Sequence, residues 1–187
     1  MNAENMHQRL AEILCELSLR TGHFVLASGK TSSYYLDCRK TTLHPEGSYL
    51  VGELMNDALL ERGWNVAAVG GLTMGADPVA TAVALTSYLR KRSVSAFIVR
   101  KERKEHGTGQ RIEGAPPAGS RVALVEDVVT TGGSTLVAAR AVREAGLEVI
   151  GALAVVDRAE GGGKALREAG IELVSLFTAS ELLSRGH

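Results

Sequence analysis

Apolar residues recur with two different spacings along the chain. From residue 66 onward, short apolar runs alternate with segments in which apolar residues return every three or four positions. The runs are typical of strands buried on both faces, and the spaced segments are typical of amphipathic helices. A capping box at Thr178 and Glu181 opens a last helix. The expected strands are 66–69, 95–100, 121–126, 149–156 and 172–177, and the other expected helices are 78–91, 135–145 and 164–169. This alternation predicts an α/β fold with a five-stranded, parallel, doubly wound (Rossmann-like) sheet.

The first 65 residues break the alternation. Apolar spacing predicts a helix over residues 5–21, which Gly22 ends. Two β-rich segments, 23–26 and 34–37, flank a turn, and Pro45 begins a helix that runs to Gly63. We expect this part to form a small hood over the carboxyl edge of the sheet. The chain is then a single domain, 1–187, with a helix and hood region at 1–65 and the core sheet at 66–187.

The stretch from Val122 to Thr135 carries the strongest chemical signal. A buried strand, Val122 to Val125, is followed by Glu126 and Asp127 and then by a turn rich in hydroxyls and glycines that opens a helix. Ligands of open α/β sheets bind at this place, and free N–H groups at a helix N-terminus favour an anion. A phosphate beside two carboxylates indicates a phosphorylated sugar. A turn without a ligand is the alternative, but two adjacent carboxylates repel and need cations or hydroxyl partners.

Other phosphate-binding patterns are absent from the sequence. It contains neither the Gly-x-x-x-x-Gly-Lys-Ser/Thr pattern of nucleotide triphosphatases nor Gly-x-Gly-x-x-Gly after a strand. Residues 122–135 instead resemble the phosphoribosyl pyrophosphate signature of the type I phosphoribosyltransferases. Nearly the whole chain is similar to the orotate phosphoribosyltransferases of that family. The resemblance implies a phosphoribosyltransferase core and a site for phosphoribosyl pyrophosphate formed in part by Glu126, Asp127, Val128, Val129, Thr130, Thr131, Gly132, Gly133 and Ser134.

A basic segment, 100–114, lies between two expected core strands. It has almost no apolar residue and three glycines, which predicts a mobile surface loop over 101–116 at the ligand edge. A solvated hairpin without function is the alternative. The segment matches a family pattern, Arg–Lys–x–x–Lys–x–His–Gly, through Arg100, Lys101, Lys104, His106 and Gly107. The resemblance implies that the loop closes over the pyrophosphate, that Lys101, Lys104 and His106 are catalytic together with Asp127, and that Lys101 reaches the site of the partner subunit in a homodimer.

The turn after the first core strand, 70–78, resembles the pyrophosphate loop of the family. Asp77 would cap the helix that begins at Pro78. Some members of the family carry a lysine where this chain has Met74, so backbone N–H groups of Thr73, Met74 and Gly75 are the expected pyrophosphate donors.

The hood and the end of the fourth core strand supply the expected orotate site. The segment 28–37 resembles the hood motif of the family; Ala27 stands where some members have a lysine, and Lys30 could compensate. Arg158 offers a planar fork that suits a carboxylate, and the family uses an arginine here to hold orotate; a surface ion pair is the alternative. Tyr34 and Tyr35 are equally consistent with the hood core and with base contacts. The expected orotate-binding residues are Thr130, Arg158, Tyr34 and Tyr35.

Composition bounds the possible partners and location. Lys and Arg number 21, equal to Asp and Glu at 21, so no net charge attracts nucleic acid or a membrane. The sequence shows no transmembrane run and no signal peptide, which favours a cytoplasmic protein. Cys15 and Cys38 have no metal-ligand spacing and are interpreted as small buried thiols.

The resemblance implies an enzyme of pyrimidine biosynthesis. It would be a Mg²⁺-dependent glycosyltransferase that converts phosphoribosyl pyrophosphate and orotate to orotidine 5′-monophosphate and pyrophosphate. Mg²⁺ would be held through substrate oxygens near Glu126 and Asp127 rather than by a protein cage. Two alternatives stay open: a purine phosphoribosyltransferase, which Arg158 and the hood motif argue against, and a nucleic-acid-binding regulator with this fold, which the neutral charge argues against.

Overall fold

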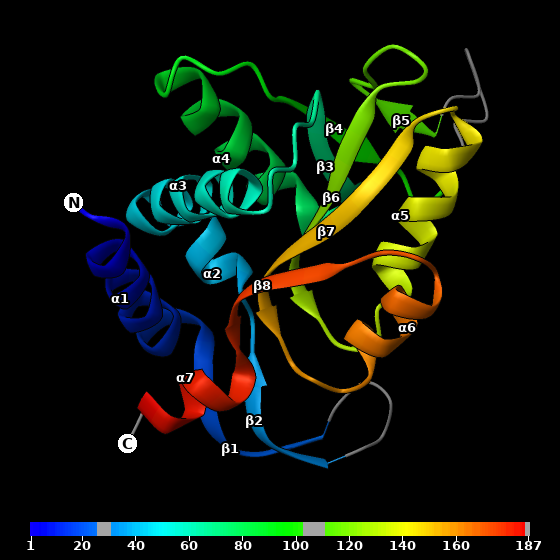
Figure 1. Ribbon diagram of the computed structural model, residues 1–187. Coiled ribbons are helices and arrows are strands. Elements are labelled where there is room, and N and C mark those ends of the chain that lie inside the picture. Colours follow the sequence, from blue (N-terminus) through cyan, green and yellow to red (C-terminus); the bar gives the residue numbers. More distant parts are fainter. Residues whose placement is uncertain (26–30, 103–110, 186–187) are drawn as a thin grey trace.

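A six-stranded sheet forms the centre of the protein. The computed structural model describes residues 1–25, 31–102 and 111–185 (Figure 1). The strand order is β5-β4-β3-β6-β7-β8. The strands are β3 (Ala68–Leu72), β4 (Ser95–Val99), β5 (Ile112–Glu113), β6 (Arg121–Val129), β7 (Glu148–Asp157) and β8 (Leu173–Thr178). Five strands are parallel, which confirms the predicted sheet; β5 joins the edge antiparallel to β4. It lies in the segment expected to be a loop, where the buried Ile112 anchors it.

Helices cover both faces of the sheet (Figure 1). On one face lie α4 (Ala76–Leu89) and, packed on it, α3 (Pro45–Glu61); on the other lie α5 (Gly133–Glu144) and α6 (Gly162–Glu168). Strand β6 shows why both layers are needed. Ala123 and Val125 enter the core beneath α3 and α4, whereas Val122 and Leu124 enter the core beneath α5. All four are buried, so this strand is apolar on both faces.

The hood is built from the described residues among the first 42 and from the C-terminal helix. It contains α1 (Ala3–Ile13), the π-helical turn η1 (Leu14–Ser18), the hairpin of β1 (Leu19–Val25) and β2 (Thr31–Leu36), α2 (Arg39–Thr42) and α7 (Ala179–Arg185). Figure 1 places the hairpin beyond the carboxyl ends of the parallel strands. A buried hydrogen bond between the Ser18 and Thr41 hydroxyls, 2.7 Å, ties η1 to α2. The expected hood over this edge is therefore present. None of the helices within the described residues is long and apolar enough to cross a membrane.

Several element boundaries differ from the sequence predictions. The first helix was predicted to reach residue 21, but helical structure ends at Ser18, and Leu19 and Arg20 pair with Leu36 and Tyr35 in the hairpin. Gly22 accordingly lies inside β1 and does not end a helix. The long-range pairing of two strands here outweighs the helical spacing of the local sequence.

The first core strand and the helix after it also begin and end elsewhere than predicted. Strand β3 continues through Gly70 and Gly71, because its ladder with β4 extends to Leu72. Helix α4 begins at Ala76, so the predicted N-cap role of Asp77 is wrong; its carboxylate instead accepts a hydrogen bond from the Thr73 hydroxyl at 2.7 Å. The capping box at Thr178 is confirmed, since the Thr178 N–H donates to Glu181 Oε2 at 2.6 Å and the Glu181 N–H donates to Thr178 Oγ1 at 3.3 Å.

Close packing of α3 on α4 generates a test of the fold. A Cβ at Gly52 would lie 2.5 Å from the Ala82 carbonyl oxygen and 2.7 Å from Thr86 Oγ1. We expect Gly52→Ala to push the helices apart and to lower the free energy of unfolding by about 1–3 kcal/mol, the usual cost of overpacking a core. Urea unfolding measures the change. Glu61→Ala, at an exposed position of the same helix, is the control and should change stability by less than about 0.5 kcal/mol; an equal effect of both variants would contradict the packing argument.

Candidate active site

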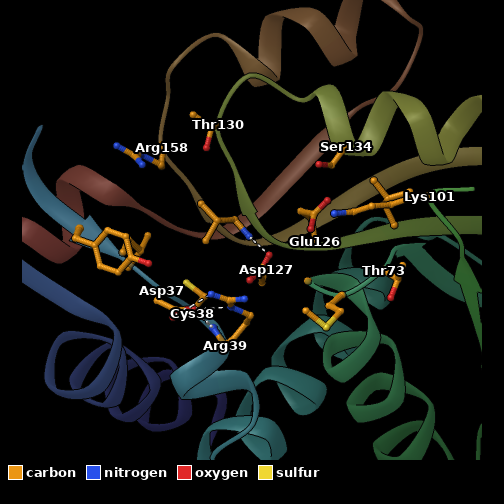
Figure 2. Close-up of a pocket in the computed structure, with 16 residues that line it drawn as sticks. Asp37, Cys38, Arg39, Thr73, Lys101, Glu126, Asp127, Thr130, Ser134 and Arg158 are labelled. Atoms are coloured by element: carbon orange, nitrogen blue, oxygen red, sulfur yellow. Dashed lines mark hydrogen bonds and ion pairs between the residues drawn. The ribbon is translucent and has the colours of Figure 1, made fainter. Parts of the chain in front are cut away.

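The carboxyl ends of β3, β6 and β7 and the underside of the hood enclose one pocket of about 390 Å³ (Figure 2). Its volume is within the usual range for small-molecule sites. Five chain segments that are distant in sequence meet here. The lining residues are Tyr35, Leu36, Asp37, Cys38, Arg39, Leu72, Thr73, Met74, Gly75, Lys101, Glu126, Asp127, Val128, Thr130, Ser134 and Arg158.

The two acids of the signature lie at the centre of the pocket (Figure 2). They were predicted to follow the end of their strand, but β6 continues to Val129, because Val128 and Val129 pair with β7. The strand thus carries the acids as fixed side chains. Glu126 is only 7% exposed, and its Oε2 has no hydrogen-bond partner among the described residues. Asp127 Oδ1 accepts a hydrogen bond from the Val128 N–H at 2.9 Å.

Burial changes the proton affinity of both acids. Loss of hydration, together with the negative charge of Asp127, raises the pKa of Glu126 to about 8. Burial also raises the pKa of Asp127, an effect that the Val128 N–H and the Arg39 guanidinium oppose in part. The free pocket therefore holds a pair of carboxyl groups that gain from a cation or from hydroxyl donors.

The turn after β6 forms a smaller cavity of about 90 Å³ beside the acids. Gly132 has a φ of 80°, in the left-handed region, and leads into α5 without a side-chain cap on that helix. The turn is held from behind, because the Gly162 N–H donates to the Thr130 carbonyl oxygen at 3.0 Å. An uncapped helix N-terminus at a fixed turn offers backbone N–H donors to an anion. The lining residues are Glu126, Val128, Val129, Thr130, Thr131, Gly132, Gly133, Ser134 and Thr135.

The turn between β3 and α4 packs directly against the acids. The peptide bond between Thr73 and Met74 is cis. A Cβ on Gly75 would lie 2.5 Å from Asp127 Oδ1 and 2.7 Å from Glu126 Oε1. Glycine is thus required for this approach of backbone to carboxylates. Met74 is 67% exposed and presents no charge to the pocket.

Arg158 enters the pocket from the end of β7. Its Nε donates to the Tyr34 hydroxyl at 3.1 Å, its Cζ lies 4.8 Å from the centroid of the Tyr34 ring, and its Nη2 pairs with Glu160 at 2.8 Å. Tyr34 itself packs against the hood core and does not line the pocket, whereas Tyr35 lines it. The two tyrosines therefore have different surroundings: Tyr34 supports the arginine, and Tyr35 faces the cavity.

The structure describes only part of the basic loop. Lys101 lines the pocket of its own chain, and its ammonium points toward Glu126 (Figure 2). Arg100 pairs with Glu113, Nε to Oε1 at 2.9 Å, and does not line the pocket. Lys104, His106 and Gly107 of the loop, and Ala27, Ser28, Gly29 and Lys30 of the hood, lie outside the described residues.

Comparisons with known proteins agree with this geometry. The phosphoribosyl transferase domain family matches residues 42–169. The orotate phosphoribosyltransferase of Aquifex aeolicus is 49% identical over 94% of this chain and 97% of its own length. The crystal structure of the Mycobacterium tuberculosis H37Rv orotate phosphoribosyltransferase with Fe(III) dicitrate has a TM-score of 0.84 at 43% identity, covering 95% of this chain and 98% of that one. The same enzyme in complex with 5-phospho-α-D-ribosyl 1-diphosphate has a TM-score of 0.80 at 40% identity over the same shares.

The chain belongs to the orotate phosphoribosyltransferase family. The resemblance drawn from the sequence is confirmed, and the chain is a phosphoribosyltransferase with the fold of the type I enzymes. The sequence of this family member nevertheless left part of its pocket unassigned. Asp37 was predicted only as the end of the hood motif, Cys38 only as a buried thiol, and Arg39 was given no role, yet all three line the cavity. The acid at the end of the hood motif and an arginine two residues later were the available signal.

The phosphoribosyltransferase pocket has no complete protein ligand set for a metal in the part of the chain that is described. No group of three or more His, Cys, Asp or Glu residues there is placed to hold an ion. Glu126 and Asp127 give two carboxylates, and the buried Glu126 Oε2 has no hydrogen-bond partner among the described residues. These acids therefore suit an ion that takes most of its ligands from substrate and water, as Mg²⁺ does.

The raised pKa of Glu126 predicts a pH dependence of stability. The pKa of this carboxyl group is about 8 in the folded protein and 4.5 as its ordinary value, so between these values the folded state binds more protons than the unfolded state. Its contribution to the free energy of unfolding is therefore full below pH 4.5 and is lost as the pH rises through 8. We expect Glu126→Gln to melt about 5 °C above the parent at pH 9 and close to it at pH 5. Thermal melts with a chelator and without substrate measure this. A parent and variant that differ equally at both pH values would show that Glu126 does not carry the proton.

Proposed function

We propose that this protein transfers ribose 5-phosphate from phosphoribosyl pyrophosphate to orotate, giving orotidine 5′-monophosphate and pyrophosphate in pyrimidine biosynthesis. The observation that carries the proposal is the meeting of three parts in one pocket: the uncapped helix N-terminus after β6, the acid pair, and Arg158. Together they match a phosphate, a sugar and a carboxylate. A cytoplasmic location is part of the same proposal.

The signature turn is assigned to the 5′-phosphate. The residues that precede and begin α5 line the small cavity, and Thr131 and Ser134 among them carry hydroxyls. An anion here gains from the helix dipole and from hydrogen bonds with donors that have no helical partner. This contact anchors the sugar at one end without taking part in the reaction.

The acid pair is assigned to the ribose. Glu126 and Asp127 lie between the phosphate turn and the pyrophosphate loop, so carboxylate oxygens can accept hydrogen bonds from the 2′- and 3′-hydroxyls. Bond breaking at the anomeric carbon gives an oxocarbenium-like centre, which nearby negative charge stabilises. Mg²⁺, when bound with phosphoribosyl pyrophosphate, would neutralise the diphosphate, and Glu126 and Asp127 are the residues that would hold it with substrate oxygens.

The leaving pyrophosphate is assigned to the opposite wall. Met74 and Gly75 supply backbone N–H groups there, and Lys101 supplies a positive charge. The Thr73 N–H, also expected from the sequence, is not among these donors, because it donates to the Val99 carbonyl oxygen at 2.9 Å. Arg100, Lys104 and His106 complete the proposed set, the last two from outside the described residues. The described residues that line the pocket contain no nucleophile–base arrangement for a covalent intermediate. The proposed chemistry is therefore direct displacement, in which positioning and charge stabilisation lower the barrier.

Orotate is assigned to the space between Arg158 and Thr130. Arg158 is held by Tyr34 and Glu160 and is only 11% exposed at its side chain, which leaves its position well defined. A guanidinium suits the orotate carboxylate, which uracil and the purines lack. Tyr35 lines the same cavity and is assigned to the base.

The direct test is the loss of orotate absorbance with phosphoribosyl pyrophosphate and Mg²⁺. Turnover with orotate, and none with adenine, hypoxanthine or uracil, is expected. Arg158→Ala should weaken orotate by about 2–4 kcal/mol, the scale of removing one partner of a charged pair, and should change phosphoribosyl pyrophosphate little. Isothermal titration measures both, with Arg143→Ala, an exposed arginine on α5, as the control. Equal weakening of both substrates would sink the orotate assignment of Arg158.

We also propose a two-fold homodimer in which Lys101 serves the partner subunit's site. The proposal comes from the family pattern of the basic loop. Lys101 lines the pocket of its own chain, so the test has to distinguish action on the partner's site from action on its own. Lys101→Ala and Asp127→Asn should each be nearly inactive. In the second variant the side chain keeps its shape but the negative charge near the reacting sugar is lost. Refolded together, they form mixed dimers with one intact site, and activity should recover to roughly a quarter of the parent's.

The mixture also separates the two roles of Lys101. If Lys101 acts within its own chain, every site in the mixed dimer keeps one defect, and activity stays at the level of the two components. Mass spectrometry confirms that mixed dimers have formed. If mass spectrometry instead shows only monomers, the proposed homodimer is wrong.

A further inference from the structure

Arg39 is a cation of the pocket to which the sequence assigned no role. It is the first residue of α2, directly after the hood strand β2, and it lines the cavity. Its Nε donates to Asp37 Oδ1 at 2.8 Å and its Nη2 donates to Asp37 Oδ2 at 3.2 Å. This two-point contact holds the guanidinium in one orientation.

The pairing with Asp37 leaves binding capacity unused. A guanidinium has five N–H donors, and Asp37 accepts two of them. The side chain of Arg39 is 48% exposed, so the remaining donors face open space and not the protein interior. The pair is only partly exposed, since the Asp37 side chain is 17% exposed, and ion pairs near the surface typically contribute about 0–1 kcal/mol to stability. Stability alone is therefore a weak reason for this arrangement.

The position of Arg39 relates it to one part of the substrate. Figure 2 shows Arg39 next to Asp127, on the hood side of the pocket and away from the phosphate turn that carries Ser134. The same cavity is lined by Met74 and Gly75 of the pyrophosphate loop, and Arg39 and Met74 also share the lining of the groove beside it. Arg39 thus lies at the mouth of the pocket, beside the loop assigned to the diphosphate.

The charges of the pocket point the same way. Its lining within the described residues has three cations, Arg39, Lys101 and Arg158. Arg158 is engaged by Tyr34 and Glu160 near the base, and Lys101 lies on the far side of the acid pair from Arg39. The pyrophosphate loop, residues 73–75, has no charged side chain. Among the described residues that line this pocket, Arg39 is the hood cation that a diphosphate placed against that loop would meet.

We infer that Arg39, oriented by Asp37, binds the diphosphate group of phosphoribosyl pyrophosphate and of the pyrophosphate product. The inference rests on the proposed function and adds one binding residue to it. The hood then contributes positive charge to the leaving group in addition to covering the site. Arg39 acts by binding; it neither donates nor accepts a proton in the reaction.

The test separates the diphosphate from the rest of the substrate. Isothermal titration with Mg²⁺ uses three probes: phosphoribosyl pyrophosphate, inorganic pyrophosphate and ribose 5-phosphate. Arg39→Gln should weaken the first two by at least about tenfold, the scale of one lost charged hydrogen-bonded contact, and ribose 5-phosphate by less than about twofold. Arg39→Lys should recover part of the affinity, because a point charge replaces a planar fork.

The chain offers a matched control in Arg62. It forms an exposed ion pair with Glu172 at 2.8 Å, and its side chain is 49% exposed, close to the 48% of Arg39. Unlike Arg39, it does not line the pocket, because it lies at the end of α3. Arg62→Gln should leave all three affinities unchanged. Asp37→Asn, which keeps Arg39 but removes its holder, should weaken pyrophosphate less than Arg39→Gln does. Melting temperatures of all variants verify that they are folded.

The outcomes decide between binding and structure. Parent-like pyrophosphate affinity in folded Arg39→Gln would overturn the inference, and so would an equal loss for ribose 5-phosphate, which indicates a collapsed hood. Failure of the parent to consume orotate would instead count against the proposed function. Pyrophosphate binding to the parent is measured separately, so the two failures are distinguishable.

Discussion

The structure depends on a central strand that is buried on both faces and carries two acids near its carboxyl end. Strand β6 lies between β3 and β7, with helices above and below it, so its position cannot shift without disturbing every layer. Glu126 and Asp127 are therefore placed in a partly desolvated pocket by the packing of apolar residues that precede them. The cost of burying their charge is visible in the raised pKa values of both acids.

The other groups of the pocket surround that acid pair. Gly75 brings the pyrophosphate loop against the carboxylates without a side chain between them. Lys101 and Arg39 approach the pair from two sides, and the signature turn presents N–H donors beside it. The proposed substrate carries phosphate, hydroxyls and diphosphate and would satisfy all of these groups at once.

The hood contributes more than a cover. Its hairpin places Tyr34 under Arg158, and its short helix α2 places Arg39 at the mouth of the pocket. Tyr34 and Arg158 are 124 residues apart, and Arg39 shares the pocket lining with Asp127 of β6, so neither arrangement follows from local sequence. The hood thereby contributes to both proposed sites: β2 supports the residue assigned to the base, and α2 carries the residue assigned to the leaving group.

The sequence alone determined the alternation of strands and helices, the signature turn and the family, because buried parallel strands and phosphate-binding turns depend on local patterns such as Val122–Val125 and Thr130–Thr135. It did not determine where α1 gives way to β1, since the pairing of Leu19 with Leu36 is a long-range contact. It also missed β5, the course of β6 beyond the acids, and the place of Arg39. These features depend on which segments meet at the carboxyl edge of the sheet, and only the tertiary structure decides that, because the meeting residues are distant in sequence and carry no shared local signal.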